Sequence, residues 1–74
     1  MVPIELPLRG EHITLDALLK ASGLASSGGA AKLLIADGGV RVNGQTEMRR
    51  GRKLRAGDEV TIGIQRVVCT IREK

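Results

Sequence analysis

Five positive charges lie within seven residues in the run RRGRKLR, between Arg49 and Arg55. Like charges this close repel one another and lower the stability of the fold unless an anion offsets them. Four of the five are arginines, whose planar guanidinium makes paired hydrogen bonds to a phosphate. A charged loop that only maintains solubility is the alternative. We expect phosphate contacts from the cations of this basic loop (residues 48–55), which are Arg49, Arg50, Arg52, Lys53 and Arg55.

The positive charge of the chain is concentrated around this loop. The net charge of the 74 residues is +4. The segment from Arg41 to Arg55 has six basic residues and one acid, Glu47, which gives +5, and the remaining residues sum to −1. Such an uneven charge distribution indicates a negatively charged binding partner and says little about the fold.

A second candidate for anion binding is the sequence SSGG from Ser26 to Gly29, which precedes a helical pattern. The first N–H groups of a helix have no partner within the helix, and glycine allows a phosphate to approach them. Either Ser26 or Ser27 can cap this helix, and a capping role alone explains the serines equally well. The GxxxxG spacing that begins at Gly23 is not a nucleotide-binding loop, because Gly29 and Ala30 replace the required lysine and hydroxyl residue.

Catalytic chemistry has little support in the sequence, because His12 and Cys69 are the only histidine and cysteine. Cys69 alternates with Val67 and Ile71 and is expected in the core, whereas His12 is expected in a solvated turn. One histidine and one cysteine complete neither a disulfide nor a protein zinc site. We expect no enzyme activity, no small-molecule substrate, no metal and no cofactor.

The absence of aromatic residues narrows the kind of nucleic acid. Proteins that bind single strands stack the bases on aromatic rings, and this chain has no Phe, Tyr or Trp. Binding must then depend on phosphate charge, backbone amides and shape, which suits folded or double-helical RNA. Duplex DNA is compatible with the charge, but the second predicted helix offers few side chains that read base edges in a major groove.

The length allows a single domain, residues 1–74. An acid at Glu5 and two early prolines do not fit a signal peptide, and the longest apolar run, from Leu33 to Ala36, is far too short for a membrane span. We expect a cytoplasmic monomer without membrane contact. An exposed edge strand at residues 2–6 is the feature that could pair two chains.

Hydrophobic periodicity predicts an α+β fold, in which two helices pack on a small, mainly antiparallel sheet. Residues 1–8 alternate as a strand. A first helix follows from a cap at Thr14 to a stop at Gly23, with three leucines inward, and a second runs from the serines to Gly38. The inward residues of the second helix are expected to be Ala31, Leu34 and Ile35, with Leu33 alongside.

The second half of the chain has the pattern of short strands. Residues 40–42 form a strand, and Asn43-Gly44 is a strong hairpin signal that places residues 45–47 on a return strand. The basic loop follows, and then a turn at residues 56–58. Strands at 59–62 and 67–71, joined by residues 63–66, complete the predicted order β-α-α-β-β-β-β.

Read in order, these residues resemble the alpha-L motif, the RNA-binding domain first described in ribosomal small-subunit protein four. The resemblance runs from Leu15 to about Ile62 and rests on LDALL, GLASSG, AKLLIADGGVRVNG, EMRRGRKL and AGDEV. The EMRRGRK run further resembles the small stand-alone YbcJ-like branch of that family.

The resemblance implies that structured RNA, ribosomal or transfer RNA, lies across the start of the second helix and the following β-loop, with the ribosome as a candidate partner. Many relatives have an arginine where this chain has Gly28, so backbone amides or Lys32 would contact the phosphate instead. Asn43 also has a structural role in its turn. Beside the basic loop, the candidate RNA-binding residues are Ser26, Ser27, Gly28, Lys32, Arg41 and Asn43. The alternative function is a protein-interaction module whose basic loop docks onto an acidic protein.

Overall fold

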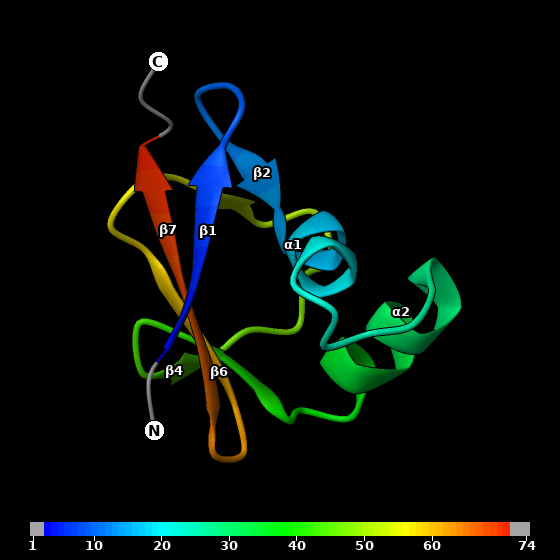
Figure 1. Ribbon diagram of the computed structural model, residues 1–74. Coiled ribbons are helices and arrows are strands. Elements are labelled where there is room, and N and C mark those ends of the chain that lie inside the picture. Colours follow the sequence, from blue (N-terminus) through cyan, green and yellow to red (C-terminus); the bar gives the residue numbers. More distant parts are fainter. Residues whose placement is uncertain (1–2, 72–74) are drawn as a thin grey trace.

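The computed structural model describes residues 3–71 as two helices beside a five-stranded sheet, with a separate pair of very short strands (Figure 1). The elements in chain order are β1 (Ile4–Leu8), β2 (Ile13–Thr14), α1 (Leu15–Ala21), α2 (Gly28–Ala36), β3 (Val40–Val42), β4 (Gln45–Thr46), β5 (Lys53–Leu54), β6 (Glu59–Ile62) and β7 (Gln65–Ile71). The predicted α+β architecture is confirmed.

The main sheet has the strand order β1-β7-β6-β3-β4, and its pairs are antiparallel except for β1 and β7, which run parallel. β1 is therefore an edge strand, as its proline predicts, since Pro7 has no N–H to give to a second neighbour. The predicted strand included Met1 and Val2, which lie outside the described residues.

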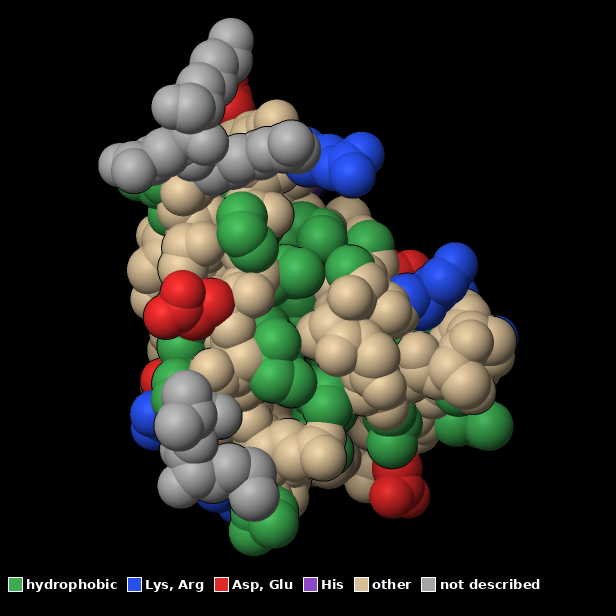
Figure 2. Space-filling view, in the orientation of Figure 1, with side chains coloured by type: hydrophobic (Ala, Val, Ile, Leu, Met, Phe, Trp, Pro, Cys, Tyr) green, Lys and Arg blue, Asp and Glu red, His purple; other side chains and the backbone are tan. Residues whose placement is uncertain are grey.

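The core lies between the sheet and α1. Alternation along the strands places Val40, Val60 and Val67 on one face, where they meet the leucines of α1. The fully buried side chains are Leu15, Leu18, Leu19, Ile35, Leu54, Val40, Val60, Val67 and Cys69. Figure 2 shows further hydrophobic side chains as a band between the sheet and the helices. The prediction that Cys69 is a core residue is confirmed.

The helix boundaries match the predictions, but one cap and one inward residue do not. Ser27 caps α2, since its Oγ accepts the Ala30 N–H at 3.1 Å. Thr14 stands at the N-cap of α1 and makes no capping bond; its hydroxyl donates to Asp16 Oδ1 at 2.7 Å. Leu33 does not accompany the inward stripe: it is 71% exposed, since it lies two residues from Ala31 on the opposite side of the helix.

The predicted basic loop is shorter than expected. Lys53 and Leu54 form β5, which pairs with β2, because Leu54 is fully buried and needs a partner strand for its backbone. Two other boundaries also change. β4 ends at Thr46 and leaves Glu47 outside the strand, and the turn before β7 contains only Gly63 and Ile64, since residues 65 and 66 pair with β6.

Candidate nucleic-acid interface

The backbone of the basic loop is fixed to the start of α1. The Leu15 N–H donates to the Arg52 carbonyl at 2.9 Å, and the Asp16 N–H donates to the Arg50 carbonyl at 3.2 Å. These two amides are among the helix N–H groups that a side-chain cap would otherwise satisfy. The loop therefore replaces the missing Thr14 cap, and in return the helix holds two of the loop's carbonyls in place.

Glu47 fixes two side chains of the same loop. Its backbone N–H donates to the Val40 carbonyl of β3 at 3.0 Å, and the residue is only 7% exposed. The carboxylate accepts Arg49 Nε at 3.1 Å and Arg49 Nη2 at 3.3 Å, and it also accepts Arg52 Nη1 at 2.7 Å. The Arg49 N–H adds a further bond at 3.1 Å. The hydrogen bonds from Arg49 and then Arg52 lower the pKa of Glu47 to about 2, so the carboxylate is charged at neutral pH.

The other cations of the loop are available to a ligand. Arg50 and Lys53 are exposed, and within residues 3–71 no carboxylate lies within 4.0 Å of either. The Arg55 side chain has one ion pair among these residues, with the exposed Glu11 at 4.0 Å, and such a surface pair is weak. The Arg55 backbone N–H donates to Asp58 Oδ2 at 2.8 Å, which anchors the end of the loop.

The start of α2 is an open helix terminus. Ser26, Ser27 and Gly28 are exposed, and Lys32 is exposed one turn further along. A Cβ added at Gly28 would meet nothing within 4 Å, so a side chain could begin at this position without displacing a neighbour. α1 packs against α2 and is also hydrogen-bonded to the basic loop, so it connects the two elements that carry the candidate features.

The structure separates Arg41 from the helical side of the molecule. Arg41 points away from the buried Val40 and Val42, and its neighbours across the sheet are Thr46 and Thr61. On that outer face it lines a small polar depression with Thr61 and glycines 38, 39 and 63. The candidate residues therefore occupy two sides of the sheet.

Asn43 is occupied by bonds within the protein. Its φ of +52° and the following Gly44 φ of +86° form the predicted hairpin turn. Its Oδ1 accepts the Glu59 N–H at 2.9 Å and its Nδ2 donates to Asp58 Oδ1 at 3.0 Å. The structural role that the sequence suggests is confirmed, and it uses both ends of the side-chain amide.

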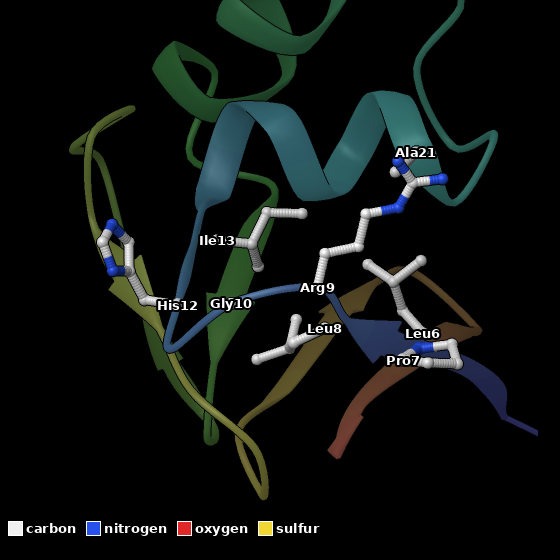
Figure 3. Close-up of a pocket in the computed structure, with 8 residues that line it drawn as sticks. All are labelled: Leu6, Pro7, Leu8, Arg9, Gly10, His12, Ile13 and Ala21. Carbon is white, nitrogen blue, oxygen red and sulfur yellow. The ribbon is translucent and has the colours of Figure 1, made fainter. Parts of the chain in front are cut away.

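His12 and Cys69, the two candidate catalytic residues, differ in exposure, since His12 is exposed and Cys69 is buried. Figure 3 shows a mainly apolar groove in which Leu6, Leu8 and Ile13 lie beside α1, while His12 points outward from its rim. Cys69 is buried in β7, where it pairs with Leu6 of β1, and this burial raises the pKa of its thiol. No three His, Cys, Asp or Glu side chains between residues 3 and 71 come together as ligands for a metal ion.

Neither helix described here has the length and apolar character that crossing a membrane requires.

Sequence reasoning missed the role of Glu47. The sequence pattern places this residue at the end of the return strand and in the run EMRRGRK, but it predicts neither its burial nor its bonds to the arginines. The available signal is its isolation, since it is the single acid among six cations between Arg41 and Arg55. A lone acid in such a segment is a candidate partner for more than one arginine.

Comparisons with known proteins agree on one family. A family model described as "S4 domain" matches residues 6–70. The chain is 46% identical over 52 residues to a protein of Bacillus subtilis named "Probable ribosome maturation protein RlbA", which covers 70% of this chain and 73% of the relative. It is 44% identical over 50 residues to an Escherichia coli protein named "Putative RNA-binding protein YbcJ", with 68% and 71% of the two chains covered.

Proposed function

Because the chain belongs to the S4 domain family, we propose that it binds structured RNA without catalysing a reaction. The RNA is of the ribosomal or transfer type, and the contacts are made mainly to phosphates. The names of the two relatives, which refer to RNA binding and to ribosome maturation, support this choice of ligand. Ribosomal RNA, free or within a ribosomal particle, is the first ligand to test.

The observation that carries the proposal is the geometry of the basic loop. Its backbone is bonded to α1 and to Glu47, so its cations are presented from a fixed frame. Arg50 and Lys53 are exposed and have no carboxylate within 4.0 Å among residues 3–71. A fixed frame lowers the ordering cost of binding, and unpaired cations gain the most from a phosphate.

The start of α2 contributes a second phosphate contact in this proposal. Backbone N–H groups and the helix dipole favour an anion there, and Lys32 adds a charge on the next turn. Ser27 supports the site by fixing the helix end, while Ser26 and Gly28 leave the approach open. Arg41 acts on the outer face of the sheet, where a second RNA segment would contact it.

The test is a salt titration of binding to a ribosomal RNA fragment, transfer RNA, duplex RNA, duplex DNA and single-stranded RNA. A variant with Arg50→Ala and Lys53→Ala is compared with a control that loses two other exposed cations. These are Lys20, in the last turn of α1, and Arg9, which lines the same groove as Ala21 at that end of the helix (Figure 3). Both variants lose two charges. The loop variant is expected to bind folded RNA more weakly and to show a salt slope smaller by about 1.8, since each phosphate contact contributes about 0.9.

Three outcomes contradict the proposal. A flat salt response excludes phosphate contacts. Equal losses in the two variants mean that only net charge matters. Equal binding to all five nucleic acids leaves a nonspecific charged surface, and an acidic protein partner, which binds after nuclease treatment, becomes the better hypothesis.

A further inference from the structure

Glu47 is the one carboxylate that is hydrogen-bonded to side chains of the basic loop in residues 3–71. It lies at the base of a surface that the proposed function assigns to phosphates. A negative charge beside phosphates is unfavourable by Coulomb's law, so charge alone predicts that Glu47 weakens RNA binding. Its contacts indicate the opposite effect.

The carboxylate restrains two long side chains that would otherwise be free to rotate. Arg49 gives Nε and Nη2 to Glu47, and Arg52 gives Nη1. An arginine has five side-chain N–H groups, so most donors of both remain available to a ligand. The Arg49 side chain is 75% exposed and that of Arg52 is 36% exposed, which leaves these donors accessible.

Glu47 also sets the position of the loop relative to the sheet. Its backbone N–H binds the Val40 carbonyl of β3, and its carboxylate accepts the Arg49 N–H. The Arg52 N–H in turn donates to the Arg49 carbonyl at 3.3 Å. The buried residue Glu47 thus contacts the sheet through its backbone N–H, and it holds the turn of the loop and two guanidinium groups through its carboxylate.

We propose that Glu47 is a positioning residue for RNA binding, which preorganises Arg49 and Arg52 so that the loop binds phosphates without first being ordered. This inference rests on the proposed function. If Glu47 positions the arginines, removing its carboxylate weakens RNA binding. If only charge matters, removing a negative charge strengthens RNA binding, so the two explanations predict opposite results.

The experiment compares Glu47→Gln with Glu11→Gln. Each removes one negative charge, but Glu11 is an exposed residue whose only approach to the loop is the 4.0 Å contact with Arg55. Glu11→Gln is expected to bind folded RNA as tightly as the unmodified protein or more tightly. Glu47→Gln is expected to bind about tenfold more weakly, since two rotamer-rich side chains must then be ordered on binding. Equal or tighter binding by Glu47→Gln overturns the proposal.

A second pair of variants decides the matter if Glu47→Gln fails to fold. Arg49→Lys and Arg50→Lys both keep the charge and both lose the fork that matches a phosphate. Only Arg49→Lys also loses the paired bonds to Glu47. Arg49→Lys is expected to weaken binding several-fold more than Arg50→Lys, and equal losses overturn the proposal.

Failure of this inference is distinguishable from failure of the proposed function. If the unmodified protein binds no folded RNA, both are wrong. If it binds with a steep salt dependence and the Glu47 and Arg49 variants behave as charge alone predicts, RNA binding stands and Glu47 has no positioning role.

Discussion

Replacing Asn43 is expected to destabilise the protein without a direct loss of RNA binding. The alpha-L resemblance points to this residue as an RNA contact, but its amide oxygen and nitrogen are both bonded, to the Glu59 N–H and to Asp58. The two bonds join the hairpin to a segment 15 and 16 residues later in the chain. An RNA contact would have to compete with them.

The size of the effect follows from the contacts. Asn43→Gly keeps the positive φ without strain but loses two hydrogen bonds, at about 0.5–1.5 kcal/mol each, so it costs about 1–3 kcal/mol. Asn43→Ala loses the same bonds and adds about 1–2 kcal/mol for a left-handed conformation with a Cβ. A domain of this length has a free energy of unfolding of roughly 4–11 kcal/mol, so the glycine variant is expected to remain folded.

The assay is urea unfolding of both variants, followed by RNA titration at a temperature where circular dichroism shows each to be folded. The expected result is a lower unfolding midpoint for glycine, a still lower one for alanine, and RNA affinity within about twofold of the unmodified protein for the folded variants, a difference of less than 0.5 kcal/mol. A tenfold loss of affinity in Asn43→Gly with an unchanged midpoint would refute the reasoning and place the side chain on the RNA.

Two further predictions concern stability. Ser27→Ala is expected to cost about 1 kcal/mol through the lost cap, and Ser26→Ala less than about 0.5 kcal/mol, in thermal unfolding; equal costs would contradict the assignment of the cap. The free energy of unfolding is expected to fall as the pH drops from 4.5, the ordinary pKa of Glu47, towards about 2. Between these pH values the carboxylate stays charged in the folded state and is protonated in the unfolded state. Asp16 and Asp58, whose pKa values are also lowered, contribute to this loss of stability, so Glu47→Gln should reduce the loss without abolishing it. The measurement is urea unfolding of both proteins at pH 7, 4 and 2.5. An equal loss of unfolding free energy in the two proteins would contradict the assignment to Glu47.

Local signals explain why much of the fold was predictable. Asn43, Gly44, Gly23 and Gly38 have positive φ, a conformation that glycine and asparagine adopt more readily than other residues. These residue types therefore mark the turns in the sequence. The alternation of Val40 and Val42 around Arg41 gives the buried and exposed faces of β3 directly. These features depend on neighbours in the sequence, and each is visible without a structure.

The features that were missed depend on partners far away in the chain. β2 and β5 have two residues each, too few for any periodicity, and they exist because Ile13 meets Leu54. The parallel pairing of β1 with β7 joins the two ends of the described chain, and no alternation specifies strand direction. Leu33 was assigned inward from its hydrophobicity, although its phase on α2 places it outside.

The number of phosphate contacts cannot be predicted from the sequence either, because a count of cations does not show which of them are already bonded to a carboxylate. The five cations of the basic loop fall into two groups in the structure. The side chains of Arg49 and Arg52 are hydrogen-bonded to Glu47, whereas among the described residues those of Arg50 and Lys53 have no carboxylate within 4.0 Å and that of Arg55 has only the exposed Glu11 at 4.0 Å. Replacing all five by alanine should reduce the salt slope by about 4.5 if every cation contacts a phosphate, and by about 2.7 if only the second group does. A change near 4.5 is expected, because the proposed role of Glu47 places Arg49 and Arg52 on phosphates as well, and a change near 2.7 would contradict that role.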